Sequence, residues 1–299
     1  MIKNAFIYTA KFSGTINRNE LNRIAAGCPF TECQPTQHKS AGFVPPRQGG
    51  EMVEWIDDNV IMDIRIDTRK VPAEAVRKEV DRMAALIEDQ TGRKPGKKQR
   101  KELTEQAEHE LMPKAFTKTA VVRVWISLAH GFAVLGTGSQ GVADEIMTSL
   151  AVMFDGIANF GVVQTQMSPT AAMTHWLGTG EAPYNFTVDR ECELKSLDEM
   201  KSVVKYNRHN LDTDEVKQHI VSGKVPTRVA LTWRDRVSFV LTDALTLKKI
   251  ALLDVVMLDG KDKGEDAFTA DVTIFTAEMS DMLDDLSLAL GGLAQPLTE

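Results

Sequence analysis

Residues 203–240 read VVKYNRHNLDTDEVKQHIVSGKVPTRVALTWRDRVSFV, and this stretch contains the clearest succession of secondary-structure signals in the chain. Asp212 is followed by Glu215 at the spacing of an N-cap and a capping box, which predicts a helix that extends to Ser222. Gly223 is placed to end this helix. The residues before Asp212 are predicted to form a strand that leads into the helix.

Two runs of alternating apolar and polar residues follow Gly223. Their apolar positions are Val229, Leu231, Trp233, Val237, Phe239 and Leu241. Arg234 and Asp235 lie between the runs and predict a tight turn, so the strands are expected to pair antiparallel and to share one apolar face. Positive charge gathers at one end of this unit, on Lys205, Arg208, His209, Lys217 and His219. This arrangement favours a polyanion over a small substrate as the partner.

The chain resembles the family of bacterial recombination-associated proteins RdgC over nearly its whole length. The resemblance rests first on Arg208 and His209, followed by the capped helix and the segment HIVSGKVPTRVALTWRDRVSFVL. Four shorter pieces occur in the family order: GFVPP at 42–46, LMPKAF at 111–116, ELKSL at 193–197 and ALGG at 289–292. No piece is a catalytic signature, but their common order and spacing are specific.

The resemblance implies both an assembly and a function. Family members are head-to-head ring dimers that encircle duplex DNA with little sequence preference and restrain the RecA recombinase. Arg208 and His209 match DNA-facing positions of the family, although His209 stands where some relatives carry an uncharged amide. Phe116 matches a residue that inserts into an apolar pocket on the tip of the partner protomer. We therefore expect a non-enzymatic DNA-binding homodimer, without cofactor or metal, in the nucleoid.

Length and composition favour a globular protein with two or three compact units. The chain has 299 residues, of which 43% are apolar and 26% charged, as is typical of soluble globular proteins. The apolar run Val121–Leu135 is interrupted by Arg123 and His130, so no membrane span is expected. The first residues lack the apolar region of a signal peptide, and three cysteines are an odd number. The cytoplasm is the expected compartment.

The net charge of −7 is unevenly distributed along the chain. Between Arg93 and Lys118, eight basic residues stand against four glutamates. Acidic residues dominate the C-terminal part, with Asp254, Asp259, Asp262, Glu265, Asp266, Asp271, Glu278, Asp281, Asp284 and Asp285. An acidic outer surface and a basic inner surface would reconcile the negative total with a polyanionic partner.

The order of the predicted elements favours an α+β fold and a horseshoe-like protomer with three lobes. Alternation in Val60–Ile66 predicts a strand with one polar face, and Thr119–Leu128 predicts a second strand of the same sheet. Between them, Pro72 opens a helix that ends near Gly92, and residues 95–112 form a second helix. The expected lobes are a central lobe of residues 1–70 and 119–167, a helical tip of residues 71–118, and a base of residues 168–299.

The tip and the base supply the candidate phosphate contacts. The predicted DNA-binding side chains are Arg93, Lys94, Lys97, Lys98, Arg100, Lys101, Lys114 and Lys118 in the tip and Arg208 and His209 in the base. Each lone lysine is equally consistent with a solvated helix face, since charge runs are common on surface helices. Phe116, predicted to lie in the dimer interface, has a second interpretation in which it folds back onto the helical hairpin, because large apolar residues are usually buried.

Two enzymatic classes remain open. Residues 136–141 read GTGSQG at the spacing of a dinucleotide-binding loop, but the strand before them belongs to a predicted hairpin, which favours a tight turn and a helix start. Glu193 and Lys195 match half of a metal-dependent nuclease site, yet Asp189 lies on the same segment and not on another strand. Binding of a labelled dinucleotide would support the first class, and magnesium-dependent loss of intact duplex the second.

Other chemical signals are weak. Cys28 and Cys33 have no second ligand pair, and the histidines form no ligand spacing, so no metal site is expected. Asp281, Asp284 and Asp285 recur at helical spacing opposite an apolar stripe. This pattern predicts a solvated helix face and not a catalytic pair.

Overall fold

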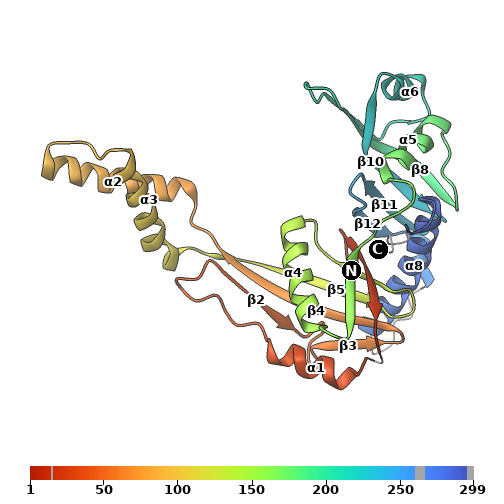
Figure 1. Cartoon of the computed structure of the whole chain (residues 1–299), viewed down its shortest axis with the longest axis horizontal. Helices are drawn as coiled ribbons and strands as arrows, with labels where there is room; N and C mark the ends of the chain where they lie inside the picture. Colours follow the sequence, from red (N-terminus) through yellow and green to blue (C-terminus); the bar gives the residue numbers. More distant parts are fainter. Residues whose placement is uncertain (15, 260–266, 295–299) are drawn as a thin grey trace.

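The computed structural model describes residues 1–14, 16–259 and 267–294. Its elements form a mixed α+β fold with two antiparallel sheets and a helical hairpin, and the chain has the outline of a crescent (Figure 1). The α+β class is confirmed, whereas the ring dimer stays a prediction. Three acidic residues of the C-terminal part, Asp262, Glu265 and Asp266, lie outside the described residues.

The central sheet joins strands that lie far apart in the sequence. In spatial order it contains β2 (Lys39–Val44), β4 (Asn59–Arg69), β5 (Thr117–Ser127), β6 (Phe132–Leu135), β1 (Phe6–Phe12) and β7 (Ala158–Val162), and β3 (Val53–Ile56) also pairs with β4. Two helices, α1 (Arg18–Gly27) and α4 (Gln140–Met153), pack on one face. Val60, Met62 and Ile64 of β4 are buried beneath them, so the alternation predicted for this strand is confirmed.

The opposite face of β4 is polar, as predicted, but it is not exposed. Asp63 and Asp67 are only 6% and 3% exposed. Arg123 of β5 donates hydrogen bonds of 2.8 and 2.7 Å to Asp63, and Arg65 donates two of 3.0 Å to Asp67. Thr119 adds a bond of 2.7 Å to Asp67. Each buried carboxylate is tolerated because it is paired and hydrogen-bonded.

Asp67 should contribute to stability in a pH-dependent way. Its pKa is lowered, first because Arg65 donates hydrogen bonds to the carboxylate and also because Thr119 does, although burial opposes the shift. A lowered native pKa stabilises the fold above the unfolded pKa of about 3.9, and this contribution is lost as the pH falls through the native value. We expect Asp67→Asn to destabilise the protein at pH 7 and to have a smaller effect near pH 2.

Thermal denaturation between these pH values, monitored by circular dichroism, tests this expectation. Asp58→Asn, at an exposed position near the start of β4, is the matched control and should leave the pH profile unchanged. An equal loss of stability at both pH values for Asp67→Asn would show that the side chain acts through packing and not through its charge.

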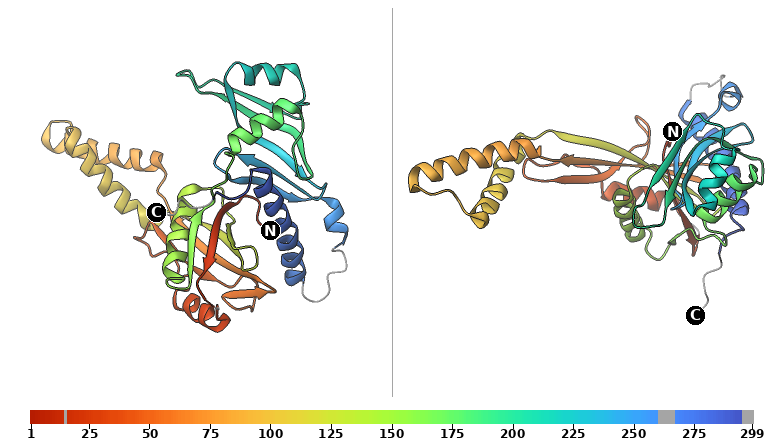
Figure 2. Two further views of the ribbon diagram at one scale, coloured as in Figure 1. Left: turned by 45° about the vertical axis from the view of Figure 1, so that its right-hand side comes forward. Right: turned by 90° about the horizontal axis from the view of Figure 1, so that it is seen from above.

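The helical hairpin is inserted between β4 and β5. It consists of α2 (Ala73–Thr91), α3 (Lys97–Leu111) and the 3-10 turn η1 (Met112–Lys114). As predicted, Pro72 precedes the first helix, and Gly92 ends it with a φ of 71°. The two helices close on a small core of their own. Because β4 and β5 pair up to Arg69 and Thr117, they carry the hairpin away from the rest of the chain (Figure 2).

The second sheet forms the other end of the crescent. In spatial order it contains β12 (Leu247–Leu252), β11 (Val237–Thr242), β10 (Lys224–Trp233), β8 (Phe186–Ser196) and β9 (Val203–Asn207). The predicted hairpin of β10 and β11 is confirmed, and Arg234 and Asp235 have φ values of 48° and 53°. Positive φ at both positions is the conformation of a type I′ turn, which matches the twist of paired strands. Two helices, α5 (Pro169–Thr179) and α6 (Asp214–Val221), pack beside β10.

The predicted capping of α6 is wrong. Thr213, and not Asp212, is the N-cap residue, and its hydroxyl accepts a bond of 3.5 Å from the amide three residues later. Asp212 instead forms an ion pair of 2.7 Å with Lys217. The carboxylate of Glu215, predicted to complete the capping box, accepts a hydrogen bond of 2.8 Å from the Tyr206 hydroxyl. Both carboxylates are therefore bound by side chains and not by the free amides of the helix N-terminus.

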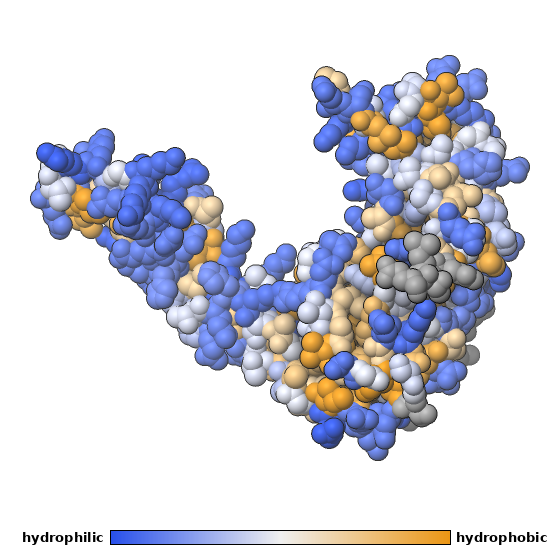
Figure 3. All heavy atoms as spheres, viewed as in Figure 1, coloured by the Kyte–Doolittle hydropathy of each residue, from blue (hydrophilic) through white to orange (hydrophobic). Residues whose placement is uncertain are grey.

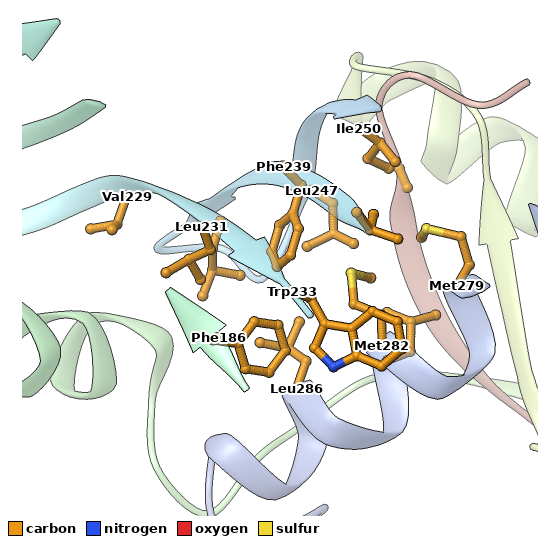
Figure 4. Close-up of a cluster of buried hydrophobic side chains, with 14 of the residues drawn as sticks. Phe186, Val229, Leu231, Trp233, Phe239, Leu247, Ile250, Met279, Met282 and Leu286 are labelled. Atoms are coloured by element: carbon orange, nitrogen blue, oxygen red, sulfur yellow. The ribbon is translucent and has the colours of Figure 1, made fainter. Parts of the chain in front are cut away.

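The long C-terminal helix lies between the two sheets. The remaining helices are α7 (Asp254–Asp259) and α8 (Ala267–Ala289). Figure 4 shows Met282 and Leu286 of α8 beside Trp233 of the second sheet. The same buried cluster includes Trp125 of the central sheet, whose ring centre lies 6.0 Å from that of Phe275. The two sheets thus share a core, and the division into three lobes stays a prediction about folding units.

The solvated face predicted for α8 needs a correction. Asp281 and Asp284 are exposed, but Asp285 is half-buried. Its carboxylate accepts hydrogen bonds of 2.8 Å from the Trp233 indole and 3.0 Å from Arg234. The reason is tertiary: the turn between β10 and β11 packs against this side of the helix.

Candidate nucleic-acid interface

The predicted phosphate-binding side chains of the tip are all exposed. They are Arg93, Lys94, Lys97, Lys98, Arg100, Lys101, Lys114 and Lys118. The first six lie in the α2–α3 connection and at the start of α3, and the last two lie around the entry into β5. The first turn of α3 has no acidic residue, and its N-cap Gly96 offers no side-chain hydrogen bond. The free amides of this helix end and the nearby cations both favour an anion.

Three of these cations have acidic partners within the tip. Arg100 pairs with Asp81 at 2.7 Å, whereas Lys94 and Lys101 lie 4.0 Å from glutamates. Such exposed pairs contribute little free energy, so a phosphate can replace them. Within the described ranges, the remaining side chains form no ion pair: Arg93, Lys97, Lys98, Lys114 and Lys118.

Arg208 and His209 lie directly after β9, at the opposite end of the crescent. Arg208 is exposed, with a φ of 55°, a conformation that few non-glycine residues adopt and that turns the chain toward α6. The His209 amide donates a bond of 3.1 Å to the Arg190 carbonyl oxygen, and its ring centre lies 5.4 Å from that of Tyr206. This loop is therefore held by β8 and β9 while the Arg208 side chain reaches into solvent.

The positive charge around Arg208 is smaller than the sequence suggests. Lys205 pairs with Glu193 at 2.9 Å, and Lys217 pairs with Asp212 at 2.7 Å. Arg208 itself has no acidic partner in the part of the chain that the structure describes. Its side chain is therefore available to an external anion.

One protomer does not bring the two basic groups together. The tip and the second sheet form opposite ends of the crescent, and the hollow between them is lined mainly by hydrophilic residues (Figure 3). A long ligand that lay across this hollow could contact both groups at once. A small ligand could contact only one of them.

Phe116 is 95% exposed and directly follows η1 and Ala115. The interpretation in which it folds back onto the hairpin is wrong, because the hairpin core closes without it. Leu86 of α2 is also exposed, to 49%. An exposed aromatic side chain in this position can pack against the surface of another molecule. Its role in a dimer stays a prediction.

Sequence reasoning missed a second group of exposed apolar residues, at the far end of the second sheet. Leu197, Met200 and Val203, in and beside the β8–β9 turn, are 76%, 85% and 46% exposed, and Val221 at the end of α6 is 88% exposed. Figure 3 shows apolar side chains at this end. The available signal was a leucine and a methionine within a charged turn, where polar residues are usual. Both ends of the crescent therefore expose apolar side chains.

The carboxylates of the nuclease alternative are engaged with other partners. Glu193 accepts hydrogen bonds from Lys205 at 2.9 Å and Thr227 at 2.8 Å, and its pKa is lowered, chiefly by Lys205. Asp189 accepts a bond of 2.8 Å from Thr232. Among the described residues, no three His, Cys, Asp or Glu side chains gather closely enough to hold a metal ion.

The glycine-rich loop at residues 136–141 joins β6 to α4. β6 pairs antiparallel with both β5 and β1, whereas a dinucleotide-binding loop follows a parallel strand. A Cβ atom on Gly136 would lie 3.1 Å from the Arg123 carbonyl oxygen, so the glycine is explained by close packing. The predicted tight turn and helix start are confirmed. No helix within the described ranges is long and apolar enough to cross a membrane.

Comparison with known proteins identifies the family. A family model described as "Putative exonuclease, RdgC" matches residues 1–293. The chain is 38% identical over 296 residues to "Recombination-associated protein RdgC" of Dechloromonas aromatica, with 97% of each chain covered. It is 43% identical over 259 residues to the protein of that name in Cupriavidus pinatubonensis, covering 85% of this chain and 86% of the relative. The family description names an enzyme, and the names of these relatives do not. The chain belongs to the RdgC family of recombination-associated proteins.

Proposed function

We propose that this protein binds double-stranded DNA without sequence preference, as a ring-shaped homodimer, and restrains RecA-mediated recombination without catalysing a reaction. One observation carries the proposal. The tip exposes a cluster of cations around an uncapped helix N-terminus, with no acidic residue in its first turn. Cations at the N-terminus of a helix are repelled by one another and by the positive end of the helix dipole. The negative charges of a phosphate backbone offset this repulsion.

The apolar residues at the two ends of the crescent support a closed ring. A two-fold dimer uses the same patch twice, so two crescents can meet tip to tip and base to base. Phe116 would anchor the first contact, and the apolar group at the β8–β9 turn would form the second. The cations of both ends would then line one continuous hollow. Such a ring would contact a duplex through its phosphates, which carry no sequence information.

The link to recombination comes from the family. The relatives are named recombination-associated proteins. A ring that remained on a duplex would exclude other proteins from the enclosed DNA. We propose that this occlusion is how the protein opposes RecA in the cytoplasm, where the nucleoid lies.

Duplex affinity should fall steeply with salt and should not depend on sequence. If Z phosphates are neutralised, the slope of log K against log salt is about −0.9Z, and a ring that draws on both ends of two protomers predicts Z well above about 4. Fluorescence anisotropy with two unrelated labelled duplexes over a salt series measures both quantities. A duplex affinity that does not change with salt concentration would contradict the proposal. Magnesium-dependent loss of the intact duplex would instead support the nuclease class.

Variants test whether the named cations bind the phosphates. Arg208→Ala should weaken binding to both duplexes alike, because a phosphate contact carries no base information. Combined replacement of Lys97 and Lys98 by glutamine should make the slope of log K against log salt shallower. The number of neutralised phosphates, Z, should fall by about one for each lysine that contacts a phosphate in the wild type. The matched control is Arg23→Gln, an exposed position in α1 on the outer side of the crescent (Figure 1). If the control weakens binding as much as Arg208→Ala does, the binding surface lies elsewhere.

A further inference from the structure

The junction between the tip and the central sheet depends on few contacts. The chain enters the tip after Arg69, the last residue of β4, and leaves it at Phe116, just before β5. Among the residues that the structure describes, the core of the hairpin is built only from side chains of the tip itself, between Val71 and Ala115. The orientation of the hairpin is therefore decided by local contacts at this junction and not by a shared core.

The Arg69 side chain makes hydrogen bonds on both sides of this junction. Its Nη1 donates to the carbonyl oxygens of Ala115 at 3.0 Å and Pro113 at 3.3 Å, both in the tip. Its Nη2 donates to the carbonyl oxygen of Cys33 at 3.1 Å, in the loop before β2. The Arg69 amide also donates to the His38 carbonyl oxygen at 2.8 Å. One side chain thus connects the turn that precedes Phe116 with the body of the protein.

The Arg69 guanidinium is held in place by backbone carbonyl groups. Its hydrogen-bond acceptors are carbonyl oxygens, and its buried Nε has no partner within the described residues. The guanidinium carries its donors on separate nitrogens in a fixed planar fork, so it spans carbonyl groups on two sides, whereas the three donors of a lysine ammonium diverge from a single nitrogen. The site therefore demands the shape of arginine and not merely its charge.

We propose that Arg69 is a positioning residue that sets the orientation of the tip and the direction in which Phe116 points. This inference rests on the proposed ring dimer for its functional consequence, but its structural part concerns a single protomer. When Arg69 holds the junction, Phe116 and the tip cations are presented in one geometry. When it is replaced, the tip samples many orientations, and closing the ring must restrict them again.

The test compares Arg69→Lys with Arg77→Lys, a substitution at an exposed arginine of α2 that makes no ion pair within the described residues. Both variants keep their positive charge. Spin labels are placed at Gln99→Cys in the tip and Ala151→Cys in α4, both exposed, in a Cys28→Ser background. Labelled protein is diluted with unlabelled protein, so that the distances report on single protomers.

We expect pulsed electron paramagnetic resonance to give a distance distribution about twice as broad for Arg69→Lys and unchanged for Arg77→Lys, because only the first loses charge-assisted hydrogen bonds across the junction. Residence on a closed circular duplex should shorten about tenfold for Arg69→Lys, the effect of losing about one such bond. The thermal transition and the salt slope of binding to a short linear duplex should stay close to those of the wild type.

The outcomes separate this inference from the proposed function. An unchanged distance distribution in folded Arg69→Lys overturns the positioning role, whatever the DNA measurements show. A broadened distribution with unaltered residence on circular DNA supports the positioning of the tip and contradicts the ring. A large fall in the thermal transition would show a general structural role, and this result also overturns the proposal.

Discussion

Replacement of Phe116 by alanine is expected to weaken the contact between the tips of two protomers by roughly a thousandfold. Aromatic anchors at interfaces typically cost at least about 2 kcal/mol each on truncation, and two-fold symmetry removes two of them at once. At about 1.4 kcal/mol per tenfold, the pair accounts for this factor. Because Phe116 is 95% exposed in the protomer, its loss should leave the thermal transition within a few degrees of the wild type.

The consequence is measured as residence on DNA. The base contact should survive in Phe116→Ala, so the protein stays a folded dimer whose ring opens easily. Its dissociation from a closed circular duplex should be much faster than that of the wild type. Val152→Ala, which truncates an apolar side chain of α4 that is 76% exposed, serves as the control. If Phe116→Ala unfolds much earlier, while its folded molecules keep DNA as long as the wild type, the residue is structural and the ring does not close there.

Trp233→Ala should cause the largest loss of stability among the substitutions considered. The side chain is 1% exposed and lies in the core shared by the second sheet and α8 (Figure 4). Its indole donates to Asp285 at 2.8 Å, and the Arg234 guanidinium lies 4.5 Å from the ring centre. Truncation of a buried tryptophan leaves a cavity and costs about 3–5 kcal/mol. We expect the thermal transition to fall by about 10 °C.

A second tryptophan provides the control for this prediction. The Trp55 indole nitrogen is buried and has no hydrogen-bond partner within the described residues. Trp55→Phe removes this unsatisfied donor and should leave stability unchanged or slightly raised. Denaturation followed by circular dichroism compares the variants. A loss below about 1 kcal/mol for Trp233→Ala would show that α8 does not depend on this side chain.

Local sequence signals were sufficient wherever a few neighbouring residues decide the backbone. Pro72 and Gly92 bound α2, and Arg234 and Asp235 form the predicted tight turn. The alternation in β4 also identified the apolar face of this strand, which packs beneath α1 and α4. Such features depend on dihedral preferences and on the period of the strand, both of which are present in the sequence itself.

Signals that depend on charge were less informative. Asp212 is bound by Lys217 instead of capping the helix, and Glu193 neutralises Lys205 beside the predicted basic site. Asp285 lies 52 residues from Trp233 in the sequence, yet it accepts the indole hydrogen bond. A charged side chain takes whichever partner the fold brings near, and that partner often comes from another element.

The class of the fold, the limits of the helical hairpin and the family of the protein could all be inferred from the amino-acid sequence. Which side chains are exposed, where they lie and which partners they bind depend on the tertiary structure. It leaves Phe116 and the cations of the tip exposed, places Arg208 at the opposite end of the crescent, and brings three carbonyl groups around Arg69. This difference arises because hydrophobic periodicity encodes burial locally, whereas hydrogen-bond partners and exposed surfaces depend on contacts between residues far apart in the chain.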